Sequence, residues 1–127
     1  MTHFTFDPKA PTIILRAVVE GEIARVVSLI LDTGSSFTHL PWRVLQAIGY
    51  DPGTSKEKVK VVTPSGVEFP PRVKVKRIRA LGKSVEKVDV LCHDLPPEAK
   101  VDGLLGLNFL RNFNIAIRFK EGVIEID

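Results

Sequence analysis

Leu29-Ile30-Leu31-Asp32-Thr33-Gly34-Ser35-Ser36 joins an apolar run to a short loop of small and polar residues. The aliphatic residues are typical of a buried β-strand, and the residues after them are typical of a tight turn. The tripeptide Asp-Thr-Gly occurs only once in the chain. The segment therefore presents a single carboxylate, that of Asp32, at the end of a buried strand.

Each residue of this loop suits a catalytic role. Gly34 allows a second loop to approach closely, and its N–H can point at the Asp32 carboxylate. The Thr33 hydroxyl can bond the backbone of a neighbouring loop. The Ser35 hydroxyl can bond the outer carboxylate oxygen and favour its ionised form. The simpler alternative is an ordinary turn, because Asp, Gly and Ser are frequent in turns for reasons unrelated to catalysis.

The single loop also has a consequence for the oligomeric state. Two carboxylates about 3 Å apart share one proton, because they cannot both ionise, and such a pair can activate water. With one Asp-Thr-Gly loop per chain, the second carboxylate must come from an identical partner. We therefore expect a homodimer with the active site on its twofold axis. Asp102 is the alternative second carboxylate within one chain, although a solvated surface position suits it better.

The rest of the sequence predicts a mainly-β, closed or partly open barrel with two short helices. Alternating apolar residues predict strands at residues 12–19, 23–31, 37–40, 85–92, 101–105, 115–119 and 123–126. Valines after Glu57 predict two long strands that fold back across residues 63–66. Helices are expected at residues 41–48 and 107–113. The length of 127 residues suits a single domain, residues 1–127.

The order of these elements resembles the retropepsin-like aspartic proteases. The strand before Asp-Thr-Gly, the glycine-tipped turn at residues 63–66 and the second element Leu104-Leu105-Gly106 follow the family's order from residue 12 to residue 126. The run Asp102-Gly103-Leu104-Leu105-Gly106-Leu107 is especially similar to the cellular and bacterial branch. Retroviral members usually have Arg where Leu107 stands, so the ion pair made by that Arg is expected to be absent or replaced.

The resemblance implies a fold and a set of site residues. The fold is the acid-protease barrel, one lobe per chain. The catalytic loop is Asp32, Thr33 and Gly34, with Leu104-Leu105-Gly106 as its buttress. The family's substrate-covering flap maps onto residues 62–67, without the Tyr found in pepsin-like enzymes. Substrate-binding residues are then Ser35, Val62, Thr63, Pro64, Ser65, Gly66, Val67 and Leu104.

Composition and charge limit the other classes of function. The net charge is +3, with basic residues concentrated between Lys56 and Lys87. These alternate with apolar residues, and Phe69 is the only aromatic residue among them that could stack on a base, so no nucleic-acid partner is expected. A basic barrel that binds nucleic acid would rest on charge alone. No stretch approaches the roughly 18 apolar residues of a membrane span, and the first nine residues do not form a secretory signal.

The cysteine and the histidines predict neither a cofactor nor a metal site. Cys92 is the only cysteine and suits the apolar end of a strand, which favours a reducing, cytoplasmic setting or a soluble domain of a larger protein. His3, His39 and His93 lack zinc-site spacing, and His39 suits a packed strand position.

The sequence therefore predicts an aspartic endopeptidase that hydrolyses extended peptides between apolar residues. The alternative is a dimerisation or peptide-binding module of the same fold with weak or no catalysis, which the flap without Tyr favours.

Overall fold

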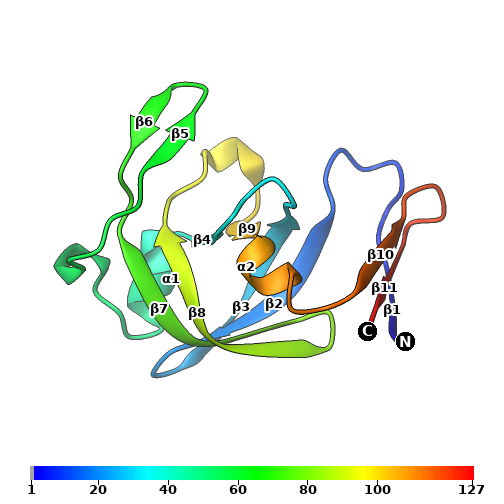
Figure 1. Ribbon diagram of the computed structural model, residues 1–127, viewed down its shortest axis with the longest axis horizontal. Helices are drawn as coiled ribbons and strands as arrows, with labels where there is room; N and C mark the ends of the chain where they lie inside the picture. The colour runs from blue at the N-terminus through cyan, green and yellow to red at the C-terminus, as the bar shows by residue number, and fades with distance from the viewer. Residues whose placement is uncertain (1) are drawn as a thin grey trace.

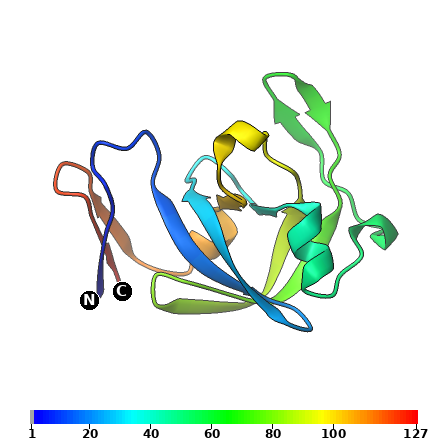
Figure 2. The same cartoon turned by 180° about the vertical axis from the view of Figure 1, so that it is seen from behind.

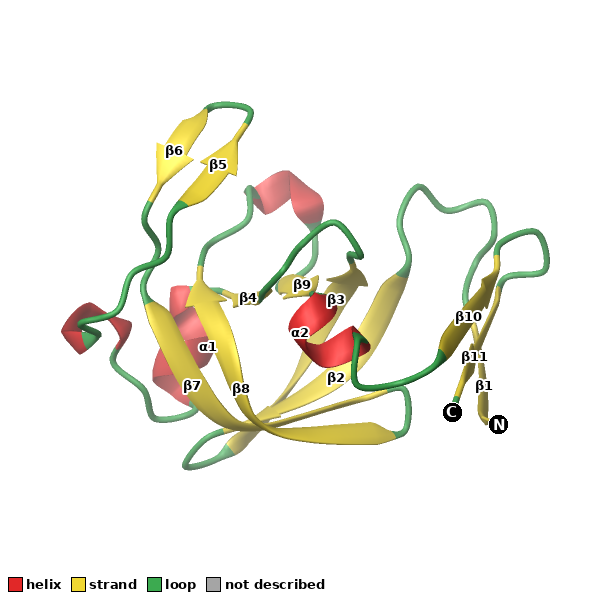
Figure 3. Cartoon of the chain, in the orientation of Figure 1, coloured by secondary structure: helices red, strands yellow, loops and turns green. Residues whose placement is uncertain are grey.

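Six strands close into a barrel in the computed structural model, which describes residues 2–127 (Figures 1 and 3). The order around the barrel is β2-β3-β9-β4-β8-β7. The bounds are β2 Ile14–Glu20, β3 Ala24–Leu31, β4 Thr38–Leu40, β7 Arg72–Ala80, β8 Lys83–Cys92 and β9 Gly103–Leu105. The predicted mainly-β barrel is confirmed. Met1, part of the predicted domain, lies outside the described residues.

The barrel is filled by the alternating apolar side chains of its strands. On β2, for example, Leu15, Ala17 and Val19 are buried while their neighbours are not. Helix α1 (Trp42–Ala47) and helix α2 (Leu107–Leu110) add Leu45 and Phe109 to the same core. Both predicted helices are present, and both are shorter than expected. Cys92, at the end of β8, is buried as predicted.

A small hairpin projects away from the barrel and forms a sheet of its own (Figures 1 and 2). It consists of β5 (Val61–Thr63) and β6 (Gly66–Glu68). The prediction of two long strands here is wrong, because Pro70 and Pro71 interrupt the second one. Proline has no N–H for a ladder hydrogen bond, so the chain leaves the hairpin before β7 begins at Arg72.

The two ends of the chain meet in a second small sheet. Its order is β1-β11-β10, with β1 at Thr2–Thr5, β10 at Ile115–Arg118 and β11 at Val123–Ile126. Strands formed by the apolar ends of a chain are candidates for exchange between the subunits of a dimer. In the structure they pair with each other instead, with Thr2 opposite Ile126 and Thr5 opposite Val123. Two 3-10 helices, Pro52–Thr54 and Pro97–Ala99, complete the elements.

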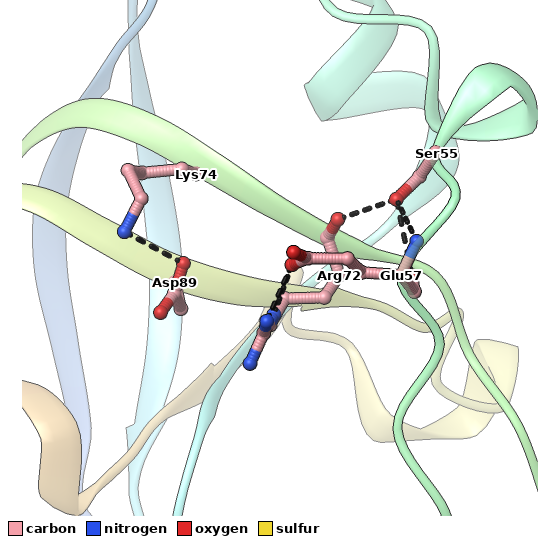
Figure 4. A network of polar contacts seen from close by, with 5 residues as sticks. All are labelled: Ser55, Glu57, Arg72, Lys74 and Asp89. Atoms are coloured by element: carbon pink, nitrogen blue, oxygen red, sulfur yellow. Dashed lines mark hydrogen bonds and ion pairs between the residues drawn. The ribbon is translucent and has the colours of Figure 1, made fainter.

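Several basic side chains near the hairpin base and along β7 are matched by carboxylates. Figure 4 shows Arg72 donating to Glu57, and Lys74 paired with Asp89 at 3.1 Å. The Ser55 hydroxyl donates to the Arg72 carbonyl at 2.7 Å, which ties the segment before the hairpin to the start of β7. Lys76 and Arg77 also pair with carboxylates, including that of Glu20. Much of the positive charge in this region is therefore balanced locally.

Candidate active site

Strand β3 carries Asp32 to the rim of the barrel. The Asp32 N–H donates to the Leu105 carbonyl at 3.0 Å, so β9 holds the start of the loop. The Gly34 N–H donates to Asp32 Oδ1 at 2.9 Å, which is the contact that the sequence predicts. A Cβ atom at position 34 would lie 3.2 Å from the same oxygen. Glycine therefore lets the loop turn tightly around the carboxylate.

Thr33 points away from this turn. It is exposed and lines a shallow hollow of about 200 Å³. The hollow is mainly apolar and is lined by Leu31, Thr33, Leu107, Leu110, Arg111, Phe113, Ile115 and Ile117. Leu107 stands where retroviral members of the family usually have an arginine. It is thus part of an apolar surface beside the Asp32 loop.

Ser35 makes different contacts from those expected. Its hydroxyl donates to the Phe37 carbonyl at 2.7 Å and lies 3.3 Å from His39 Nε2. The predicted hydrogen bond to the outer Asp32 oxygen is replaced by these contacts. The reason is local, because the chain turns at Ser36 and brings Phe37 and His39 back over the Ser35 side chain.

His39 is packed, as the sequence expected of a strand histidine. It is 7% exposed, and burial lowers its pKa to about 4, with a further lowering from His93 and an opposing effect from Asp32. His39 is therefore neutral near neutral pH. Its Nδ1 lies 3.4 Å from Nδ1 of His93, a residue 54 positions away that sequence spacing could not connect to it.

Two glycines let β9 pass against the chain that leaves the catalytic loop. A Cβ atom at Gly103 would lie 1.9 Å from the His39 carbonyl oxygen, and one at Gly106 would lie 2.2 Å from that of Phe37. Only glycine fits at contacts this close. Leu104 and Gly106 were predicted in a buttress. In the structure Leu104 pairs with Ile30 on β3 and His39 on β4, and Gly106 packs against the backbone of Phe37.

Thr38 and Asn108 hold this crossing together with hydrogen bonds that the sequence did not predict. Thr38 donates to Asn108 Oδ1 through both its N–H and its hydroxyl, each at 3.0 Å. The Thr38 hydroxyl also accepts from the Gly106 N–H at 3.1 Å, and Asn108 Nδ2 donates to the Asp89 carbonyl. In the sequence, the only signal for these contacts is one polar residue shortly after each of the two elements, Thr38 after Asp-Thr-Gly and Asn108 after Leu104-Leu105-Gly106. These hydrogen bonds fix the chain that leaves the Asp32 loop against β9 and helix α2.

A cleft of about 520 Å³ joins the catalytic loop to the hairpin. Most predicted site residues line it, namely Asp32, Gly34, Ser35, Val62, Thr63, Pro64 and Leu104. Ser65, Gly66 and Val67 lie at the hairpin turn and on β6, outside this lining, and Thr33 lines the separate apolar hollow. His39, Lys60 and His93 also line the cleft and were not predicted there.

The comparisons with known proteins agree with this geometry. A family model described as aspartyl protease matches residues 15–109, which is most of the chain. The chain belongs to the aspartyl protease family. Among solved structures, a retropepsin-like aspartic protease from Rickettsia conorii is similar with a TM-score of 0.72 at 19% identity. The match covers 100% of this chain and 99% of that one. No match was found among curated proteins.

The second acidic candidate of this member of the family, Asp102, lies elsewhere. Asp102 lines a different cleft from Asp32, so it is not a partner for that carboxylate. The Asp102 side chain, expected to be solvated, is 24% exposed and engaged in hydrogen bonds. Asp102 Oδ2 accepts the Ser28 N–H at 2.8 Å, and its other oxygen accepts from Arg43. Asp102 therefore ties β3 to helix α1.

The environment of Asp102 makes the protein's stability depend on pH. Burial alone would raise the pKa of Asp102, but hydrogen bonds from Arg43 and Ser28, with the Arg43 charge, lower it below the usual value. An aspartate with a lowered pKa stabilises the fold above its unfolded-state pKa, and this contribution is lost as the pH falls through the folded-state value. We expect Asp102→Asn to lower the free energy of unfolding at neutral pH by about 1 kcal/mol. Urea titrations should show the gap closing in acid; a gap independent of pH would contradict this.

Three further features of the described residues concern metal binding, membrane spans and the cysteine. Residues 2–127 contain no group of three or more His, Cys, Asp or Glu side chains arranged to hold a metal ion. Within the same range, every helix is too short to cross a bilayer. Burial raises the pKa of the Cys92 thiol to about 12, with a smaller contribution from Asp94, so this side chain is a poor nucleophile.

Proposed function

We propose that this aspartyl protease is a homodimeric endopeptidase in which each chain contributes Asp32 to a shared pair of carboxylates. The observation that carries the proposal is the position of Asp32. Asp32 lines the cleft, with one carboxylate oxygen held by the Gly34 N–H. One such loop per chain is half of the pair that activates water.

The surface beside the loop supports pairing with a second copy. The apolar hollow formed around Leu107 and Leu110 is also lined by Leu31 and the exposed Thr33. These last two residues flank Asp32 in the chain. A partner packed here would bring its own Asp32 to the same axis and cover apolar side chains. The two ends of the chain pair within one protomer, so the dimer needs no exchange of terminal strands.

The reaction follows from two carboxyl groups that share one proton. The ionised Asp32 takes a proton from a water held between them, and the water oxygen bonds to the scissile carbonyl carbon. The protonated Asp32 of the pair donates to the carbonyl oxygen. When the C–N bond breaks, a carboxyl group returns a proton to the amine. The pair titrates as a unit, so activity should be bell-shaped on the acidic to near-neutral side.

The hairpin supports an extended peptide as substrate. Val62 and Val67 face each other across β5 and β6 and are 74% and 51% exposed. Apolar side chains this exposed fit a surface that covers a ligand. A peptide lying between the hairpin and Leu104 would add a strand, and the cleft would take large apolar side chains next to the scissile bond. The hairpin is then the flap, and a cytoplasmic location fits the buried, unpaired Cys92.

Digestion of a peptide library from about pH 3 to about pH 8 tests the proposal, because a carboxylate pair works in this range. We expect cleavage between apolar residues, and a specific activity that rises with protein concentration as dimers form. A statine-type transition-state mimic should raise the melting temperature far more than its hydroxyl epimer. A dimer that binds peptides but neither cleaves them nor distinguishes the epimers would instead be the catalytically inactive module.

A further inference from the structure

Four polar side chains connect the hairpin to the catalytic loop. His93 Nε2 lies 3.2 Å from Glu68 Oε2, and His93 Nδ1 lies 3.4 Å from His39 Nδ1. His39 Nε2 lies 3.3 Å from Ser35 Oγ. We call Glu68, His93, His39 and Ser35 the histidine line. It begins on β6, passes the end of β8 and strand β4, and ends three residues after Asp32.

The proton positions at the catalytic-loop end follow from Ser35. Its hydroxyl proton is used on the Phe37 carbonyl, so Ser35 Oγ can only accept from His39 Nε2. His39 is neutral because its buried ring has a pKa of about 4. A neutral imidazole has one N–H, and here Nε2 carries it. The remaining nitrogen, Nδ1 of His39, must therefore accept.

The same reasoning fixes the protons of His93. Its Nδ1 must donate to His39, and its Nε2 faces the carboxylate of Glu68, which in its ionised form has no proton to donate and can only accept. Both contacts form together only if His93 carries two protons. The side chains of His93 and Glu68 are 30% and 47% exposed, so this end of the line exchanges protons with solvent.

The hairpin needs such a connection to keep its place. β5 and β6 form a separate two-stranded sheet whose residues are all exposed or partly exposed. An isolated hairpin of two short strands is marginally stable in water. The contact of Glu68 with His93 joins β6 to the wall of the cleft in which Asp32 lies.

We propose that His93 is a positioning residue that, when doubly protonated, ties the β5–β6 hairpin to the catalytic loop and holds it over Asp32. The inference deepens the proposed function, on which its catalytic meaning rests. When His93 loses a proton, its single N–H can serve either Glu68 or His39 but not both. The hairpin is therefore held in acid and released as the pH rises, which matches substrate capture to the range in which a carboxylate pair works.

Other ionisable groups share this neighbourhood. Those that face His93 or border it are Glu68 on β6, His39 on β4, Asp32 and Lys60 in the cleft, and Asp94 next in sequence. Asp94 accepts the Trp42 N–H at 3.0 Å, so it is engaged with helix α1. The variants that test the proposal change one member of the histidine line at a time and leave the rest in place.

Hydrogen exchange of the hairpin amides, residues 61–68, tests the connection without substrate. At about pH 5 we expect exchange about threefold faster in His93→Gln and Glu68→Gln than in the wild type, the effect of a half-exposed ion pair. The double variant should exchange no faster than either single one, since both remove the same contact. Near pH 8 the wild type should match the variants after correction for intrinsic rates. Lys74→Gln breaks the comparable Lys74–Asp89 pair away from the hairpin and is the matched control.

Cleavage kinetics separate this proposal from the proposed function. At about pH 5, His93→Gln should raise KM about threefold with a smaller change in kcat, and the difference should vanish near pH 8. Hairpin amides that exchange alike in wild type and variants at the acidic pH would overturn the role of His93 even if peptides are cleaved. A wild type that cleaves no peptide would overturn the protease proposal. The histidine line would still be supported if the hairpin amides of the wild type exchanged more slowly in acid than those of the variants.

Discussion

Asp32→Asn is expected to lower peptide cleavage by about three orders of magnitude while leaving a folded dimer. The substitution replaces the titrating carboxyl with an amide of nearly the same shape. In the proposed dimer it removes both carboxylates, because each protomer carries the same change. The amide oxygen can still accept the Gly34 N–H, which donates to Asp32 Oδ1 at 2.9 Å, so the loop should keep its turn. Cleavage rates and sedimentation of the same preparation measure the two effects.

Asp51→Asn is the matched control for this substitution. Asp51 Oδ1 accepts the Gly53 N–H at 3.1 Å, the same two-residue turn as at Asp32 but remote from the cleft. An effect that comes from the turn alone would appear equally in both variants, whereas an effect of the carboxylate pair appears only at Asp32. Cleavage retained by Asp32→Asn would refute the assignment of this residue.

Features carried by local patterns were predictable from the sequence. The strand before Asp32, the turn at Gly34 and the two helices depend on residues close together in the chain, and each is present. The barrel followed from alternating apolar residues together with the resemblance to a known family. The prediction of long strands at the hairpin was wrong because it joined valines on both sides of Pro70 and Pro71 into one strand. Proline lacks the N–H that the hydrogen-bond ladder of a sheet requires.

Contacts between distant segments were not predictable in the same way. His39 meets His93 across 54 positions, and Asp102 meets Ser28 across 74. Neither pair has a spacing pattern, since only the closed barrel brings β4 beside β8 and β3 beside β9. The hydrogen bond predicted for the Ser35 hydroxyl is wrong for the opposite reason. Its partners, the Phe37 carbonyl and His39 Nε2, lie within four residues and replace the predicted carboxylate.

The crossing of β9 under the catalytic loop is the point where fold and site depend on the same atoms. β9 pairs with β3 on one side and β4 on the other, and the Leu105 carbonyl accepts the Asp32 N–H. At Gly103 the backbone of β4 lies so close that an added Cβ atom would sit 1.9 Å from the His39 carbonyl oxygen. The obstacle is backbone, which cannot rotate away as a side chain can.

Gly103→Ala is therefore expected to lower the free energy of unfolding by about 3 kcal/mol or more, since overpacking against backbone forces strands apart. Urea titrations at one protein concentration measure this loss. Gly53→Ala is the control, because its Cβ atom would meet only side chains on an exposed turn, Asp51 Oδ1 at 3.2 Å and Trp42 Cζ3 at 4.0 Å. A Gly103 variant as stable as the Gly53 variant would show that β4 and β9 can separate freely. In that case the support that we assign to the Asp32 loop would lose its basis, because the crossing of β9 holds both β4 and this loop in place.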